Sequence, residues 1–179
     1  MAWTAPMTAV ANTVFTAAQF NTHVRDNLNE TAPAKATTPG AIFVATGTNA
    51  IAERYPNAQF IGTTETTAST SFVDLATVGP SVTSTTGSRA IVLLRAAMEN
   101  STTNESSHMG FAVSGASTAA ATLNRAITMD GTPAASRVRI GMAIFVDFLV
   151  AGVNTFTAQY SVSGGTGTFL SRELSVIPL

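Results

Sequence analysis

The side chains that could support acid–base or metal chemistry are few and widely spaced. The chain has two histidines, His23 and His108, and no cysteine. A zinc site needs three or four nitrogen, sulfur or oxygen ligands, and no third ligand of the usual kind is spaced near either histidine. We therefore expect no metal site, and we interpret both histidines as surface or interface residues.

The other short motifs have simpler interpretations than catalysis. The run from Gly110 to Gly115, which contains Ser114, lacks the spacing of a nucleophile elbow and predicts a strand entering a turn. The glycine-rich run 164–167 could suggest a phosphate loop, but a strand follows it where a helix N-terminus would be required. No two acidic residues form a local pair suited to acid–base work. We expect no enzymatic activity and no cofactor. The scattered acids considered are Glu65, Asp74, Glu99, Glu105, Asp130 and Asp147.

Composition favours a protein that works inside an assembly. Hydrophobic residues make up 45% of the chain and charged residues 11%, against about 25% charged residues in a typical soluble domain. The net charge is −1, which favours association, and no basic patch predicts contact with nucleic acid or a membrane surface. The apolar stretch 141–150 is interrupted by Asp147 and is too short for a membrane span. A secreted, threonine-rich β-protein is the alternative.

Most arginines fall in or beside predicted strands. At such positions they face solvent or make contacts at an interface, for which the guanidinium group is suited. Asp147 lies inside an apolar run, and we expect it to be buried in an ion pair with Arg137 or Arg139. The strand-associated arginines are Arg89, Arg95, Arg125, Arg137, Arg139 and Arg172.

A helix is predicted over residues 17–29. Thr16 and Gln19 have the spacing of a capping box, and Phe15 and Phe20 occupy the hydrophobic-staple positions around it. The segment 31–33 ends the helix at a proline. A single apolar stripe must be buried, on the chain's own β-domain, on copies of itself or on another protein. The stripe consists of Ala17, Phe20, Val24 and Leu28.

The rest of the chain predicts a mainly β protein. An extended stretch, 33–40, leads to a small hairpin, and residues 1–58 form an N-terminal arm. Residues 59–179 form an antiparallel β-sandwich, for which a jelly roll is the best match to about eight short strands. One strand, 154–162, directs four alternate apolar residues to one face. The hairpin strands are 41–45 and 50–54; the sandwich strands are 60–66, 71–78, 89–98, 109–113, 121–129, 137–148, 154–162 and 168–176; the four residues are Phe156, Ala158, Tyr160 and Val162.

Two N-terminal segments resemble those of actinobacteriophage virion structural proteins. Residues 15–28 resemble a segment near the N-terminus of such proteins. This segment runs from Phe15 through Asn21-Thr22-His23 to Leu28. Residues 34–54, with a threonine–glycine hairpin and a terminal Arg54, resemble a segment of tail-fibre and head-fibre subunits. The resemblance implies an N-terminal attachment element, an exposed C-terminal domain and a homotrimer.

The leading hypothesis is a non-enzymatic capsid decoration or head-fibre protein. Its arm would dock on the major capsid protein after assembly in the host cytoplasm, and its sandwich would lie on the outer surface of the capsid. One alternative is a minor tail or baseplate protein whose β-domain binds a receptor or carbohydrate, and another is a small hydrolase. The predicted partner-binding residues are Trp3, Phe15, Phe20, Val24, Arg25 and Leu28.

Overall fold

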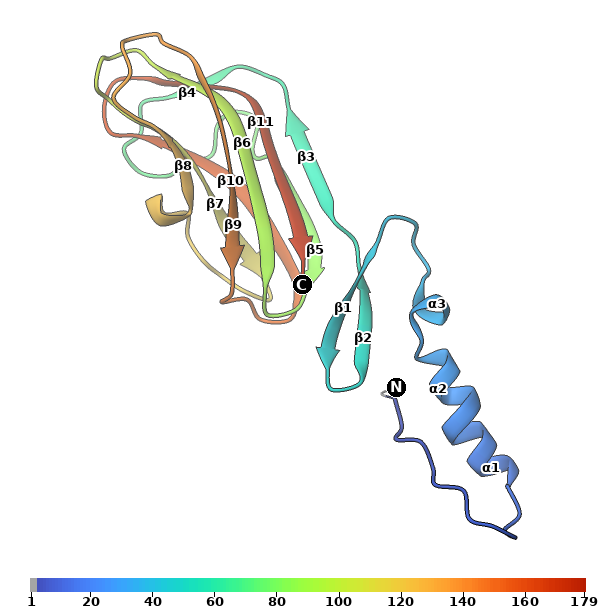
Figure 1. Ribbon diagram of the computed structural model, residues 1–179. Coiled ribbons are helices and arrows are strands. Elements are labelled where there is room, and N and C mark those ends of the chain that lie inside the picture. The colour runs from blue at the N-terminus through green and yellow to red at the C-terminus, as the bar shows by residue number, and fades with distance from the viewer. Residues whose placement is uncertain (1–2) are drawn as a thin grey trace. The chain divides into compact units, whose positions relative to one another are not determined.

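A computed structural model describes residues 3–179 of the chain (Figure 1). It divides into two compact units, with the boundary between Tyr55 and Pro56. The sequence placed this boundary after residue 58, but strand β3 (Asn57–Ile61) begins earlier. Because β3 pairs along its length with β11 (Gly167–Pro178), it belongs to the second unit.

The first unit begins with a helical segment that spans the predicted range 17–29. It consists of α1 (Ala17–Phe20), a π-helical turn (Asn21–Arg25) and α2 (Asp26–Asn29). The capping box is present, because the Thr16 hydroxyl accepts from the Gln19 amide while the Gln19 side chain accepts from the Thr16 amide. The ring centroids of Phe15 and Phe20 lie 6.2 Å apart in an edge contact, as the staple requires. The π-helical turn was not predicted.

A short helix and a hairpin complete the first unit. The prediction of an extended chain from residue 33 was wrong in part, because α3 (Ala32–Lys35) lies there. Proline is tolerated in the first turn of a helix, where its missing N–H would have no partner, and Pro33 occupies that turn. The predicted hairpin is confirmed as β1 (Ile42–Gly47) and β2 (Ala50–Arg54), paired antiparallel.

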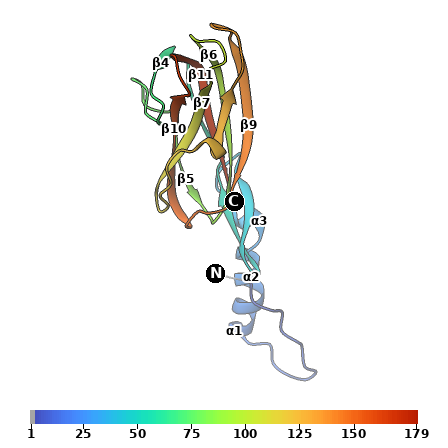
Figure 2. The same cartoon turned by 90° about the vertical axis from the view of Figure 1, so that its left-hand side faces the viewer.

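The second unit is an antiparallel β-sandwich of two sheets, which confirms the predicted fold class (Figures 1 and 2). One sheet has the order β3-β11-β6-β9, with β4 also paired to β11, and the other has the order β5-β10-β7-β8. Nearly every connection from β5 onward changes sheet, and only β7 and β8 are sequential neighbours. This alternation is the jelly-roll arrangement. The remaining strands are β4 (Glu65–Thr67), β5 (Ser81–Thr86), β6 (Ala90–Asn100), β7 (Ser107–Gly115), β8 (Ala126–Met129), β9 (Val138–Val146) and β10 (Gly152–Val162).

Three predicted strands differ from the structure. The range 71–78 is not a strand; only Val73 forms an isolated bridge, to Tyr160, because this segment crosses between the two sheets. The range 60–66 is split between β3 and β4. The range 121–129 begins with a 3₁₀ turn (Leu123–Arg125) and is a strand only from Ala126. Strand β5 lies in a segment for which no strand was predicted.

The core lies between the two sheets. The predicted inward face of β10 is confirmed, since Phe156, Ala158, Tyr160 and Val162 are all buried. Phe156, Ala158 and Tyr160 pack in one cluster with side chains of the opposite sheet, including Leu94 and Leu174. The expected buried ion pair of Asp147 is wrong, because β9 ends at Val146 and Asp147 is exposed beyond it. Arg137 pairs with Glu99 instead, at 3.1 Å.

Candidate functional site: the helical segment of the first unit

The predicted partner-binding side chains lie mainly on the surface of the helical segment and the chain before it. Phe15, Phe20 and Leu28 are 53%, 48% and 59% exposed. Trp3 is exposed to a smaller extent, and Val24 is half-buried. Arg25 is exposed and pairs with its neighbour Asp26 at 2.8 Å. The apolar stripe is thus formed, but most of its aromatic and aliphatic area faces solvent.

A buried asparagine holds the N-terminal residues against this helix. The Asn27 side chain accepts from the Thr4 amide at 2.8 Å and donates to the Thr4 carbonyl at 3.0 Å. One turn earlier, His23 Nδ1 lies 3.1 Å from the Ala5 carbonyl. The helix therefore binds the preceding main chain through polar side chains. Its apolar stripe takes no part in these hydrogen bonds. Asn27 was not among the predicted site residues, although its four-residue spacing from His23 places both on one helical face.

A carboxylate fixes the other end of this unit. Glu53 on β2 accepts hydrogen bonds from the amides of Thr37 and Thr38 and from the Thr37 hydroxyl. The hydroxyl and amide donors of Thr37 and Thr38 hold the pKa of Glu53 below its ordinary value. This contact ties the loop after α3 to the hairpin through polar groups only.

The first unit has no fully buried apolar side chain among residues 3–55. Within residues 3–55, Asn27 is the one residue in the buried class, and every apolar side chain there is at least partly exposed. Burying a phenylalanine or leucine side chain contributes about 1.5–3 kcal/mol. The helical segment thus keeps a large part of its hydrophobic free energy available for a contact outside this unit.

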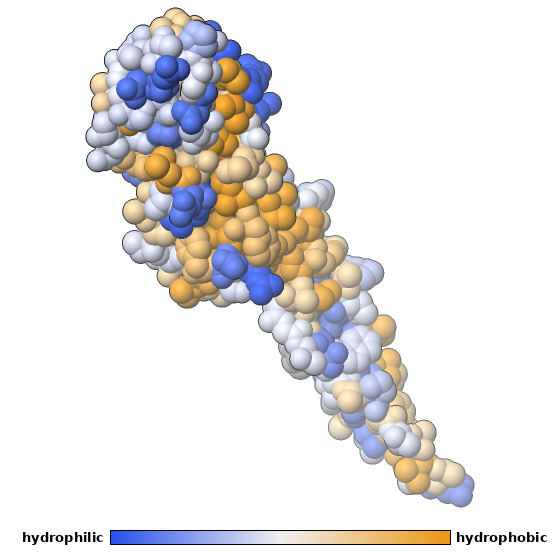
Figure 3. Space-filling view, turned by 60° about the vertical axis from the view of Figure 1, so that its left-hand side comes forward, coloured by the Kyte–Doolittle hydropathy of each residue, from blue (hydrophilic) through white to orange (hydrophobic). Residues whose placement is uncertain are grey.

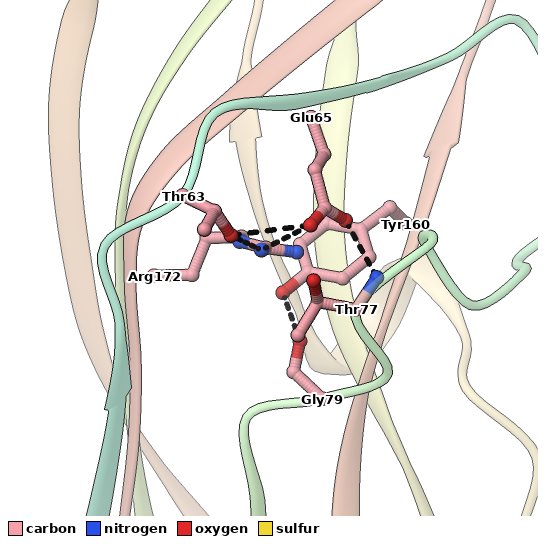
Figure 4. Close-up of polar contacts among 6 residues, drawn as sticks. All are labelled: Thr63, Glu65, Thr77, Gly79, Tyr160 and Arg172. Carbon is pink, nitrogen blue, oxygen red and sulfur yellow. Dashed lines mark hydrogen bonds and ion pairs between the residues drawn. The ribbon is translucent and has the colours of Figure 1, made fainter.

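A second group of polar residues lies inside the sandwich (Figure 4). The Arg172 side chain is fully buried; its Nη2 donates to the Thr63 hydroxyl at 2.9 Å and lies 3.5 Å from Glu65 Oε1. Glu65 also accepts from the Thr77 amide at 2.9 Å. The Tyr160 hydroxyl donates to the Gly79 carbonyl at 2.8 Å. We call these residues the buried polar cluster; they connect the 63–79 segment to β10 and β11.

The charges in this cluster are matched. Burial alone would raise the pKa of Glu65, but the hydrogen bonds from Thr77 and the positive charge of Arg172 outweigh it, so the pKa lies below its ordinary value. Burial raises the pKa of Tyr160 far above its ordinary value, so the phenol stays neutral and acts as a hydrogen-bond donor. A guanidinium held by a carboxylate and a neutral phenol makes a structural link, and no nucleophile is activated here.

The sandwich also has a surface pocket of about 360 Å³. His108 and Phe72 line it, together with several hydroxyl groups. Burial lowers the pKa of His108 despite the nearby Asp130 carboxylate, so the ring is neutral near pH 7 and can both donate and accept hydrogen bonds. The remaining lining residues are Thr70, Ser71, Leu123, Ser161, Val162 and Ser163.

By its own topology, the second unit is a jelly-roll β-sandwich. No protein-family model matches the chain, and no curated protein matches it in sequence. Among solved structures it resembles the Eiger TNF from S. frugiperda, with a TM-score of 0.48, 11% identity and coverage of 70% of this chain and 92% of that chain. It also resembles infectious bursal disease virus Gt strain, with a TM-score of 0.47, 10% identity and coverage of 74% and 36%. The VP2 subviral particle of that virus has a TM-score of 0.44, 12% identity and the same coverage.

In the part of the chain that the structure describes, no helix is long and apolar enough to cross a membrane. Across residues 3–179, no three histidine or acidic side chains gather into a group that could hold a metal ion.

Proposed function

We propose that this chain is a structural protein of a bacteriophage particle, a capsid decoration or head-fibre subunit attached through its helical segment. One observation supports the proposal above all others: the first unit exposes Phe15, Phe20 and Leu28, and none of the apolar side chains in residues 3–55 is fully buried. An element with this composition is stabilised when a partner covers it. The resemblance of residues 15–28 and 34–54 to phage virion segments supports an attachment element, and in the decoration role its partner would be the major capsid protein.

The attachment would be driven by the hydrophobic effect. Covering the two phenylalanines and Leu28 would contribute several kcal/mol, at about 1.5–3 kcal/mol for each side chain. Part of this gain offsets the entropy lost by side chains that become ordered at the contact. Because His23 and Asn27 already hold the N-terminal segment in place, little further main-chain entropy is lost on docking. Many copies on one particle would act together.

The test is attachment of full-length variants to particles. In Phe20→Asp, a charge replaces an exposed apolar side chain, and we expect at least about a tenfold loss of occupancy, since 1.4 kcal/mol corresponds to a factor of ten. Thr22→Asp is the matched control, because Thr22 is exposed on the same helical segment. Circular dichroism and thermal unfolding verify that both variants fold. Normal occupancy of Phe20→Asp would reject the proposal.

A second candidate function is a minor tail or baseplate protein whose sandwich binds a carbohydrate. The pocket beside His108 and Phe72 favours it, because an aromatic ring among hydroxyl groups suits the apolar and polar faces of a sugar. Labelling of this subunit on particles separates the two roles. Hundreds of copies over the head support decoration, whereas a few copies at the tail tip support the alternative.

A further inference from the structure

The two sheets of the sandwich present unlike outer faces. On the sheet β5-β10-β7-β8, hydroxyl groups pair between strands, Thr83 with Thr155 at 2.8 Å and Ser81 with Thr157 at 2.9 Å. Those side chains form a polar surface that water solvates well. The opposite sheet, β3-β11-β6-β9, directs mainly apolar side chains outward.

Strand register places these apolar side chains in adjacent rows. Phe145 pairs with Ile91, which pairs with Ile177, so one row crosses three strands. The next row contains Leu93, flanked by Ala143 and Ser175. Phe60 on β3 pairs with Glu173 and extends the surface to the far edge. We call this surface the apolar sheet face. Of these residues, Phe60 and Phe145 are 55% and 57% exposed.

The charges within the apolar sheet face cancel. Its middle row contains Arg95 and Glu173, whose side chains form an ion pair across adjacent strands. The centre of this surface therefore has no net charge, and Arg139 lies toward its end on β9. A strongly charged partner would find no complementary charge in the centre of this surface.

The free edge of β9 continues this surface. Among the strands that the structure describes, β9 pairs with β6 alone, so one side of its main chain has no strand partner. Proteins usually protect such an edge with proline, a bulge or several charges. From Val138 to Val146, β9 has one charged residue, Arg139, and no proline, and its pairing with β6 shows no register shift. Met142 is exposed on this strand, and Figure 3 shows apolar residues gathered in a band on this side of the sandwich.

We propose that the apolar sheet face, together with the β9 edge, is the surface through which copies of this chain associate. Four strands spaced about 4.8 Å apart and about 30 Å long cover roughly 600 Å². A specific interface takes about 800 Å² from each partner, so the face supplies about three quarters of this area and the β9 edge adds to it. Patches above about 400 Å² are seldom left uncovered on a monomer. The face and the edge both lie on every copy, so a copy can cover the face of one neighbour and offer its edge to another. Such a head-to-tail contact forms a ring when the rotation between neighbours closes. Three copies would fit the trimer that the phage resemblance implies.

The test is the mass of the full-length chain in solution, measured by light scattering after size-exclusion chromatography. We expect wild type to have a multiple of the 18.4 kDa chain mass and Leu93→Glu and Phe145→Glu to have the single-chain mass. Thr155→Glu, on the outer face of the opposite sheet, is the matched control and should keep the wild-type mass. A monomeric wild type, or an unchanged mass in both glutamate variants, would overturn the proposal.

A second measurement needs no substitution. Backbone amides of β9 should exchange hydrogen more slowly as the wild-type concentration rises, because association covers this edge. Amides of β5, the edge strand of the opposite sheet, should exchange at a rate independent of concentration. Equal behaviour of the two strands would count against the interface even if the glutamate variants failed to fold. Neither measurement involves a phage particle, so this inference and the attachment role can fail independently.

Discussion

The guanidinium group of Arg172 lies over the ring of Tyr160 inside the sandwich, with 5.4 Å between the guanidinium carbon and the ring centroid. Both side chains are fully buried and come from different sheets, Arg172 from β11 and Tyr160 from β10. Each also binds the segment that precedes β5, through Thr63 and Gly79 respectively. The buried polar cluster therefore joins three parts of the chain that no single β-ladder connects.

Removing the Tyr160 hydroxyl should weaken this junction. Tyr160→Phe keeps the ring over Arg172 but leaves the Gly79 carbonyl without its donor. We expect a loss of about 1–3 kcal/mol in the free energy of unfolding, as for a buried acceptor left unsatisfied. Urea unfolding followed by circular dichroism measures the change. Tyr55→Phe is the control, because Tyr55 is exposed and should change stability by less than about 0.5 kcal/mol.

Truncating Arg172 should be the most destabilising arginine substitution in the sandwich. Arg172→Ala leaves Glu65 without its cation and opens a cavity against Tyr160, so we expect a loss of about 3–5 kcal/mol. Arg172→Met should cost less because it fills the same space, and Nε and Nη1 of Arg172 have no hydrogen-bond partner to lose. Arg137→Ala, which breaks an exposed ion pair with Glu99, should cost about 0–1 kcal/mol. Equal unfolding midpoints for Arg172→Ala and Arg137→Ala would contradict this account.

Glu65 should make the sandwich sensitive to acid. Its pKa in the folded chain lies below the ordinary value, so the folded state binds protons less readily than the unfolded state. Its stabilising contribution is therefore complete above the ordinary glutamate pKa of about 4.3 and is lost as the pH falls through the folded-state value. Thermal unfolding should show Glu65→Gln less stable than wild type at pH 7, with the difference shrinking toward pH 3. Asp74→Asn serves as the control, and a difference independent of pH would rule out this role for Glu65.

The fold class was predictable from sequence because burial follows local pattern through most of the chain. In β10, apolar residues alternate with threonine and glutamine, and that alternation matches the buried face. The helix start was predictable because its cap requires Thr16 and Gln19 at a fixed spacing. In both cases the signal lies within a few neighbouring residues.

Arg172 shows where such local reasoning fails. Strand β11 points Phe169 inward, but the register shifts between Leu170 and Glu173. Ser171 there adopts a φ of 50°, and the inward positions change from odd to even numbers. This bulge turns Arg172 into the core, whereas strict alternation would place it on the surface with Leu170. The sequence near the bulge does not predict it. Glycine is the usual residue at a positive φ, but serine occupies this position.

Strand β5 was missed for a different reason. Its buried positions include Ser84 and Thr86, so it lacks the apolar alternation that identifies a strand. Thr86 is satisfied by Asn154 on the neighbouring β10, whose side-chain amide donates to its hydroxyl at 2.8 Å. A polar residue can be buried when a partner distant in sequence satisfies it, and that pairing is visible only in three dimensions. The burial of Asn27 was missed for the same reason, because its partner Thr4 lies in an irregular segment.

Asn27 should determine whether the N-terminal residues stay on the helix. Asn27→Ala removes two hydrogen bonds to the Thr4 main chain and leaves the contact of His23 with Ala5 as a weaker link. We expect the free energy of opening of the Thr4 amide, which donates to Asn27, to fall by about 1–3 kcal/mol, which corresponds to roughly 5–150-fold faster hydrogen exchange at this amide. The matched control is Asn29→Ala, since Asn29 is exposed on the same helix and should leave exchange unchanged. Thermal unfolding of the sandwich should be the same in both variants, because the second unit has its own core. Unchanged exchange of the Thr4 amide in Asn27→Ala would mean that other contacts hold this segment in place.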